Sequence, residues 1–161
     1  MLIEKAFAKV KGNYLNLASG YLSNSVRALT GAPVANYLTN STSNTLMWNL
    51  ISSAKLNNYL VTVGTDGEND GQVNSCGVTM RHALTVLAAF QLKNTTTNAV
   101  ITNLYMIRNP RAYTQYSKAW SNNDPNWTAD MKAQVPFGID PTTSNMQGIF
   151  FVPYDIFSTC F

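Results

Sequence analysis

Two apolar runs separated by a short polar turn are the feature that most constrains how this chain of 161 residues can fold. Residues 78–90 and 100–108 are rich in apolar and β-branched side chains, which favour strands. Residues 93–98 between them are mostly Asn and Thr, a composition typical of a hairpin loop. Asn109 and Pro110 follow the second run, and proline cannot continue a ladder of hydrogen bonds. The sequence therefore predicts an antiparallel hairpin whose second strand ends at Asn109-Pro110.

The segments on either side of this hairpin complete an α+β pattern. Residues 3–20 repeat apolar side chains at helical spacing, and a second helical segment runs to about residue 58 after a possible cap at Ser43. We expect the buried face of this second helix to contain Leu46, Met47, Leu50 and Ala54. Shorter strands are expected at 59–63 and 148–152, with a short helix at 129–134 and a turn or helix at 154–157. The sequence shows no internal repeat or linker, so it predicts one domain over residues 1–161, with N-terminal helices followed by an antiparallel sheet.

The charge pattern excludes some classes of function. Charged residues make up 12% of the chain, about half the usual share, and the net charge is only +3. Lys and Arg are scattered, which argues against a nucleic-acid interface. The low charge indicates either a surface that faces another domain or an Asn-rich source proteome. No apolar run approaches the roughly 20 residues that a membrane span needs, and the charged N-terminus is untypical of a secretory leader. We therefore expect a cytoplasmic location and no membrane span.

The cysteines and aromatic residues favour structural roles. Cys76 and Cys160 are too few for a disulfide framework, and we expect both to be reduced and buried. A single histidine excludes a zinc-finger spacing. We expect Trp48, Trp120 and Trp127 to pack the core or hold the long loop that precedes the last strand.

His82 and Asn109 are the candidate functional residues. An isolated histidine is more often structural than catalytic, but His82 begins the first strand of the hairpin and Asn109 ends the second. The start of one strand lies beside the end of its antiparallel neighbour, so the two side chains should be close. A thiol protease uses an imidazole as general base and acid, and an Asn oxygen can fix the tautomer and plane of that ring.

The sequence resembles the calpain family of cysteine proteases, specifically the second half of their protease core. The resemblance covers nearly the whole chain in collinear order. The matching segments are EKAFAKVKGNY at 4–14 (family EKAYAKLxGxY), LTG at 29–31 (FTG), GVTMRHALTV at 77–86 (GLVxGHAYSV), IRNP at 107–110 (RNPWG), AWS at 119–121 with Asp124 and Trp127 (AWSD…W), and QGIFFV at 147–152 with YDIF at 154–157 (DGEFWM and FxDF). The resemblance implies the His/Asn half of a papain-like fold, with His82 and Asn109 as catalytic residues.

The departures from the family pattern concern the nucleophile and the cover of the site. In the family, the catalytic cysteine and the oxyanion-hole glutamine lie in a preceding subdomain, and nothing in this chain corresponds to it. Arg111 stands where the family has the tryptophan that shields the His–Asn bond from water, and Ala112 stands where the family has glycine. We therefore expect this chain alone to be inactive.

The family calcium site is also altered. Its acidic ligands align with Gln115, Asn122, Gln147 and Ile149. Calcium favours several carboxylate oxygens, so we expect no tight calcium binding there and no cofactor. The acidic loop at 66–70 lacks the closing glutamate of an EF-hand and is interpreted as solvated.

Three hypotheses follow. The first is the His/Asn-bearing half of a calpain-like intracellular cysteine endopeptidase, which hydrolyses peptide bonds when it is combined with a Cys-bearing subdomain and binds a protein or peptide substrate in the cleft between them. The alternative is a non-catalytic calpain-like scaffold or protein-interaction domain. The third is an unrelated α+β binding domain.

Overall fold

The computed structural model describes residues 2–17, 20–69 and 71–161. The chain divides into two compact units, Met1–Asn36 and Tyr37–Phe161. The expectation of one domain over 1–161 stays a prediction. Among the described residues, no helix is both long and apolar enough to cross a membrane.

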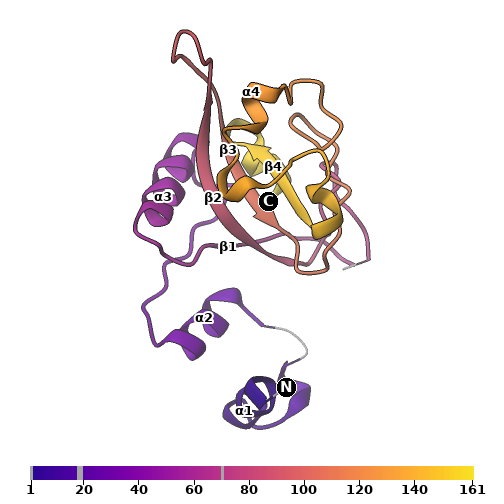
Figure 1. Cartoon of the computed structure of the whole chain (residues 1–161). Coiled ribbons are helices and arrows are strands. Elements are labelled where there is room, and N and C mark those ends of the chain that lie inside the picture. Colours follow the sequence, from indigo (N-terminus) through magenta and orange to yellow (C-terminus); the bar gives the residue numbers. More distant parts are fainter. Residues whose placement is uncertain (1, 18–19, 70) are drawn as a thin grey trace. The chain divides into compact units, whose positions relative to one another are not determined.

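The first unit consists of short helices (Figure 1, indigo to purple). They are α1 (Leu2–Val10), the 3-10 helix η1 (Tyr14–Leu17) and α2 (Leu22–Thr30). The prediction of one helix over 3–20 was therefore too long. The α-helix ends at Val10 because Gly12 turns the chain with a φ of 96°. Gly31 ends α2 in the left-handed conformation, and its N–H donates to the carbonyl of Arg27 at 2.8 Å.

The second unit is built on a four-stranded antiparallel sheet (Figure 1). Its strands are β1 (Thr62–Gly64), β2 (Ala83–Lys93), β3 (Val100–Arg108) and β4 (Ile149–Pro153), in the spatial order β1-β2-β3-β4. The β2–β3 hairpin is the predicted one, and the α+β class is confirmed. β2 begins later than residue 78, since Arg81 has a positive φ angle that interrupts an extended strand.

Helix α3 (Asn44–Leu56) begins as predicted at the Ser43 cap, whose side-chain oxygen accepts the Leu46 N–H at 3.3 Å. Its buried residues are Met47 and Ile51, whereas Leu46 is 50% exposed. The predicted inward face was thus right for Met47 but was rotated by about one residue, since Leu46 and Ile51 are both apolar and packing alone chooses between them.

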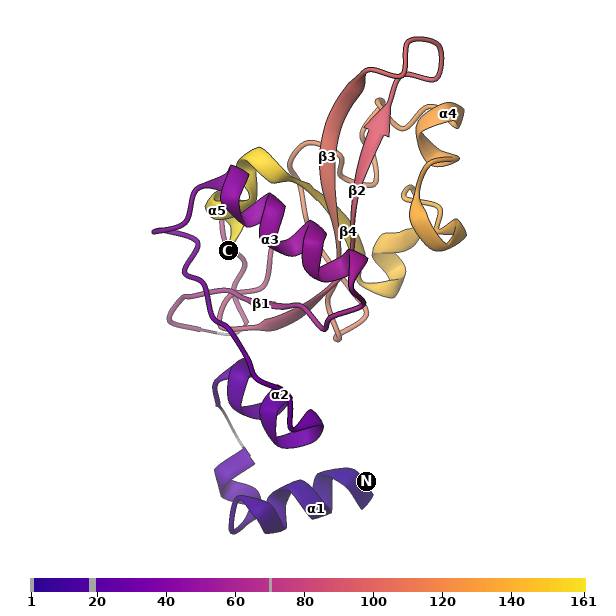
Figure 2. The ribbon, with the colours of Figure 1, turned by 90° about the vertical axis from the view of Figure 1, so that its left-hand side faces the viewer.

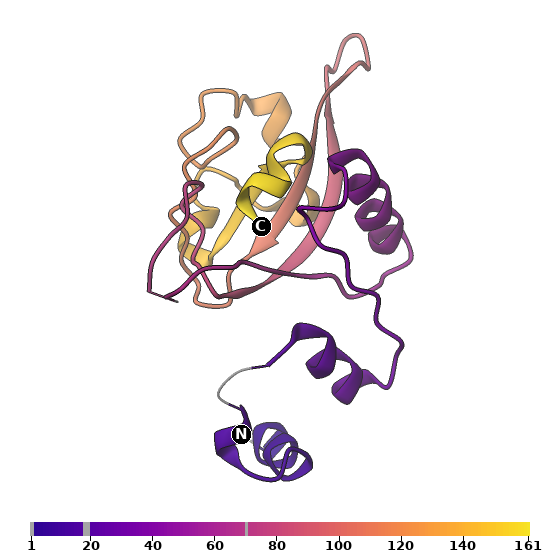
Figure 3. The ribbon, with the colours of Figure 1, turned by 180° about the vertical axis from the view of Figure 1, so that it is seen from behind.

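Two α-helices lie against the same side of the sheet. Figures 2 and 3 show α3 and the C-terminal α5 (Phe157–Cys160) on the same side. The remaining elements are α4 (Ala129–Lys132), which is shorter than the expected 129–134, and the 3-10 helices η2 (Pro136–Gly138), η3 (Ser144–Gln147) and η4 (Tyr154–Ile156).

The sheet is buried on both faces because its strands send alternate side chains into two apolar clusters. The cluster on the α3 side takes from the sheet Val63, Leu84, Val86, Tyr105, Ile107, Phe150 and Val152. The other cluster takes Ala88, Leu92, Leu104, Met106, Ile149 and Phe151, which pack with Trp120 and Trp127. Val86 and Ala88 would share a face in a regular strand, but a register shift between them inserts one extra residue. This bulge lets β2 contribute side chains to both clusters. The presence of Trp120 and Trp127 in the second cluster confirms that they pack the core.

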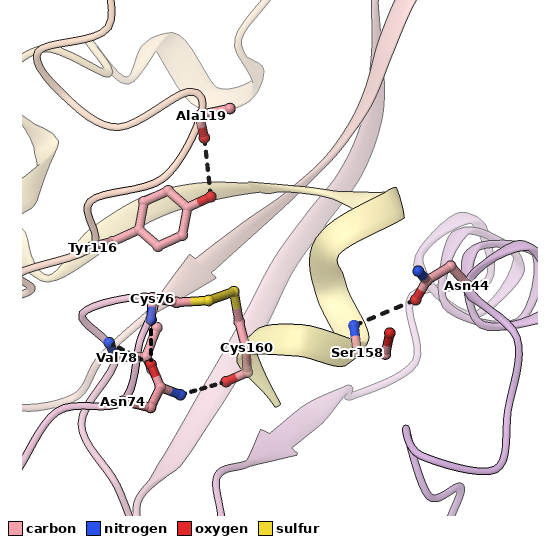
Figure 4. Close-up of a disulfide and its surroundings, with 8 residues drawn as sticks. All are labelled: Asn44, Asn74, Cys76, Val78, Tyr116, Ala119, Ser158 and Cys160. Carbon is pink, nitrogen blue, oxygen red and sulfur yellow. Dashed lines mark hydrogen bonds between the residues drawn. A yellow bond between two sulfur atoms is a disulfide. The ribbon is translucent and has the colours of Figure 1, made fainter.

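The two cysteines are joined in a disulfide, which corrects the expectation that both are reduced (Figure 4). They are 84 residues apart in sequence, but α5 packs against the loop that holds Cys76 and brings their Cα atoms to 5.5 Å, within bonding range. The expectation of burial was right, since both side chains are at most 1% exposed. Asn74 ties the same two segments, because its amide donates to the Cys160 carbonyl at 2.8 Å and accepts the Cys76 N–H at 3.0 Å.

Candidate active site

The structure brings His82 and Asn109 together. Their side chains are joined between Nε2 of His82 and Oδ1 of Asn109 at 2.8 Å. His82 lies directly before β2 and Asn109 directly after β3, and Thr85 pairs with Arg108 in the register of these strands. The antiparallel pairing therefore produces the contact that the sequence predicted.

Two backbone groups fix the orientation of the Asn109 amide. Its Nδ2 donates to the carbonyl of Tyr113 at 2.8 Å, and its Oδ1 also accepts the N–H of Arg111 at 3.0 Å. A carbonyl only accepts and a backbone N–H only donates, so the amide cannot be flipped without losing both bonds. Oδ1 must therefore face His82, and Nε2 must carry the proton of the neutral ring.

This arrangement leaves the other ring nitrogen as the base. In the neutral tautomer with a proton on Nε2, Nδ1 holds a lone pair. No group within residues 2–17, 20–69 and 71–161 hydrogen-bonds to Nδ1 of His82. His82 is partly exposed, whereas Asn109 is only 3% exposed. A buried amide thus orients an imidazole whose free nitrogen can take a proton from outside the pair.

Gly148, directly before the last strand, supports Asn109. The N–H of Asn109 donates to the carbonyl of Gly148 at 2.8 Å. Gly148 has a φ of 73°, and a Cβ on it would lie 2.4 Å from the carbonyl oxygen of Asn109. Only glycine fits this close approach. Sequence reasoning placed Gly148 in a strand and missed this role, although a glycine just before an apolar strand was a usable signal.

Thr65, directly after β1, supports His82. The Thr65 N–H donates to the His82 carbonyl at 3.0 Å, and its Oγ1 accepts the His82 N–H at 3.1 Å. Sequence reasoning missed Thr65, since nothing in the 64–71 loop distinguishes it from the many other threonines.

The residues aligned with the calcium ligands do not form an acidic group. Gln115 and Gln147 are exposed, and Ile149 is 5% exposed within the apolar core. In the described part of the chain, no cluster of three or more His, Cys, Asp or Glu side chains could hold a metal ion. Asp124 instead closes its own loop, accepting the N–H of Trp120 at 2.6 Å and that of Asn126 at 2.9 Å. The absence of a cofactor stays a prediction.

The site thus holds an oriented imidazole–amide pair at the open end of a hairpin, in which the imidazole can serve as a general base and acid. A family model described as calpain family cysteine protease matches residues 1–161, and the chain belongs to that family.

Individual relatives agree with this assignment. The chain is 26% identical over 167 residues to the calpain-type cysteine protease DEK1 of Arabidopsis thaliana, covering 99% of this chain and 7% of that protein. It is also 26% identical over 179 residues to calpain-5 of Caenorhabditis elegans, covering 97% of this chain and 28% of that protein. The chain therefore spans less than a third of the length of either relative.

Two departures from the family motifs flank the pair. The motif around His82 has glycine at the position of Arg81, and the motif around Asn109 has glycine at the position of Ala112. Arg81 has a φ of 47° and Ala112 a φ of 56°, so both keep the left-handed backbone that glycine adopts freely. The turns that present the pair thus hold two L-residues in a conformation that costs them strain.

Proposed function

We propose that this chain is the His/Asn-bearing half of a calpain-like cysteine endopeptidase, inactive alone and completed by a Cys-bearing subdomain. The hydrogen bond between Nε2 of His82 and Oδ1 of Asn109 carries this proposal. In the proposed reaction, His82 is the general base and acid, and Asn109 holds its ring.

The protonation state of the ring sets the order of proton transfers. Nδ1 takes the proton of the cysteine thiol, and the thiolate sulfur attacks the peptide carbonyl carbon. The imidazolium then gives that proton to the leaving amine, and water hydrolyses the thioester with His82 again acting as base. Asn109 donates to the Tyr113 carbonyl and accepts from Nε2 throughout, so the ring plane need not change between steps.

The proposed substrate is an extended protein segment in the cleft between this domain and the Cys-bearing one. Membership of a protease family supports a protein or peptide substrate. The partner subdomain, whether on the same native chain or added separately, supplies the nucleophile.

The test is reconstitution with the Cys-bearing subdomain of the parent protein, with cleavage of an unfolded protein substrate as readout. We expect no cleavage by this chain alone, cleavage by the pair, and a loss of at least about a hundredfold in His82→Ala. Asn109→Ala should also lower the rate of cleavage, because it removes the group that holds the ring. Asn126→Ala is its matched control and should leave the rate unchanged, since Asn126 is exposed and lies in the loop before α4. A pair that binds stably but cleaves nothing, with the nucleophile present, would contradict the proposal.

A second candidate is a non-catalytic scaffold. Arg111 supports it, because a charged side chain replaces the tryptophan that covers the His–Asn bond in the family. The upstream sequence of the parent separates the two: a cysteine in a Q-G-x-C-W-like motif favours the enzyme, and serine or alanine there favours the scaffold.

We also propose a cytoplasmic location, and the disulfide makes it testable. Cytosolic thiols are held reduced, so the Cys76–Cys160 disulfide of the structure counts against this location unless it is opened in the cell. Alkylation of thiols during lysis of the native cells decides between the two: labelled Cys76 and Cys160 support a cytoplasmic location, and recovery of the fully formed disulfide contradicts it.

A further inference from the structure

We propose that Thr65 is a positioning residue for His82, acting through a hydroxyl that bridges the turn on which the imidazole is mounted. This inference rests on the proposed function, since it concerns the geometry of the same imidazole.

The Thr65 hydroxyl joins the two ends of the segment 79–82. Its oxygen accepts the His82 N–H at 3.1 Å, and it donates to the Thr79 carbonyl at 2.6 Å. In a closed four-residue turn, the first carbonyl would accept directly from the fourth N–H. Here the hydroxyl stands between these two groups and satisfies both.

The bridge is partly buried, since Thr65 is buried while Thr79 and His82 are half-buried. Thr65 is 7% exposed, so a hydroxyl removed from it would leave two backbone groups without their partner. A buried unpaired N–H or carbonyl is costly, and the backbone moves to avoid it. The turn therefore holds its shape only while the hydroxyl is present.

Strain within the turn makes this bridge consequential. Arg81, between the bridged residues, has a φ of 47°, which an L-residue keeps only when its surroundings enforce it. His82 is the next residue, so relaxation of Arg81 rotates the backbone that carries the imidazole. The 2.8 Å bond from Nε2 to Asn109 would then lengthen or break.

Thr65 also links this turn to two other segments. Its N–H donates to the His82 carbonyl at 3.0 Å, which extends the β1–β2 ladder by one residue beyond Gly64 and Ala83. Thr79 pairs with Val73 in an isolated bridge. One buried side chain thus fixes the edge strand, the preceding loop and His82 relative to one another.

The test compares Thr65→Val, which keeps the shape and removes the hydroxyl, with Thr65→Ser, which keeps the hydroxyl. The chain has one histidine, so the imidazole resonances in an NMR spectrum belong to His82 alone. In Thr65→Val we expect the Nε2 proton to exchange with water roughly fivefold faster or more, and the tautomer with the proton on Nε2 to lose population, as expected for the loss of one net hydrogen bond. Thr65→Ser should restore both signals.

Thr128→Val is the matched control. The Thr128 hydroxyl also accepts a backbone N–H, that of Met131 at 3.4 Å, but it caps α4. Thr128→Val should leave the His82 signals unchanged. An equal change in Thr65→Val and Thr128→Val would mean general loosening and would overturn the inference.

The remaining outcomes separate this inference from the proposed function. Thr65→Val signals equal to those of the unchanged protein overturn the positioning role alone. If the unchanged protein already gives the signals of Asn109→Ala, the His–Asn pair is absent and both proposals fall. If Thr65→Val does not fold, hydrogen exchange in the unchanged protein decides: the His82 amide should be protected at least about tenfold over an unbonded peptide, and exchange at the unbonded rate overturns the inference.

Discussion

At the scale of single residues, Asn109 holds more of the site together than His82 does. The Asn109 side chain has three partners, namely His82, Tyr113 and Arg111, and is almost fully buried. Within the part of the chain that the structure describes, the ring of His82 has one hydrogen-bond partner, and the residue is partly exposed. The Asn109 amide therefore stabilises the fold, and it also holds the partly exposed imidazole of His82 in place.

We expect Asn109→Ala to lower the free energy of unfolding by about 2–3 kcal/mol, because it leaves the Tyr113 carbonyl and the Arg111 N–H without their partner. His82→Ala should cost less, about 1 kcal/mol, since only one bond to a partly exposed ring is lost. Urea unfolding of both variants measures the difference. The reverse ranking would contradict this account of the amide.

Ala112 offers a prediction of opposite sign. Its left-handed backbone costs about 1 kcal/mol for an L-residue. This cost outweighs the additional conformational entropy that a glycine at the same position would lose on folding. Ala112→Gly should therefore raise the free energy of unfolding by about 0.5 kcal/mol. Ala54→Gly, inside α3, is the matched control and should lower it by about 1 kcal/mol. Thermal unfolding of both variants tests the sign, and destabilisation by Ala112→Gly would refute it.

At the scale of elements, β3 packs Tyr105 against the helices α3 and α5, and the burial of its hydroxyl costs free energy. Tyr105 is fully buried between Trp48 of α3 and Phe157 of α5, with ring centroids 5.4 and 4.5 Å away. Its hydroxyl is buried and has no hydrogen-bond partner among the described residues. Burial also raises the pKa of Tyr105 above its ordinary value of 10.0.

Tyr105→Phe should therefore be neutral or stabilising at pH 7, because it removes an unpaired polar group and keeps the ring. The pKa shift adds a pH dependence with a definite sign. Because the pKa is raised in the folded state, folding favours the neutral phenol of Tyr105. The contribution of this difference to the free energy of unfolding is full below pH 10 and is lost as the pH rises above the unfolded-state pKa near 10. The free energy of unfolding, measured from pH 7 to 11, should fall less steeply in Tyr105→Phe than in the unchanged chain. Identical slopes would contradict the prediction.

The bulge in β2 is the element-scale feature that places the site. Without the extra residue between Val86 and Ala88, one end of β2 would turn its apolar side chains to the wrong cluster. The bulge lets the far half of β2 pack with the tryptophans while the near half continues into His82. Such irregularities are common next to active sites.

At the scale of the whole chain, the disulfide closes the second unit. It joins the loop before the His82 turn to the last helix across 84 residues. A cross-link over a loop of that length removes much entropy from the unfolded chain. The Asn74 side chain bonds the same two segments, so the closure has a non-covalent component as well (Figure 4).

We expect the double variant Cys76→Ala/Cys160→Ala to lose about 4 kcal/mol of unfolding free energy. Dithiothreitol should destabilise the unchanged protein to a similar extent and leave the double variant unaffected. Chemical unfolding with and without the reductant measures both effects. Equal stability of the reduced and oxidised proteins would show that the cross-link contributes nothing.

The sequence by itself determined the hairpin, the order of helices before sheet, and the juxtaposition of His82 with Asn109. These follow from local patterns, because the apolar and β-branched residues of 100–108 and the proline after Asn109 indicate a strand and its end. Antiparallel pairing then requires the start of β2 to meet the end of β3, whatever the rest of the chain does.

Only the tertiary structure decided which distant groups hold that pair. Gly148 supports Asn109, Thr65 bridges the turn of His82, and α5 brings Cys160 to Cys76. The same packing chose Ile51 over Leu46 as the buried face of α3. Each depends on contacts between segments far apart in sequence. A threonine or a cysteine carries no local signal of its partner until the sheet and its two clusters have brought the segments together.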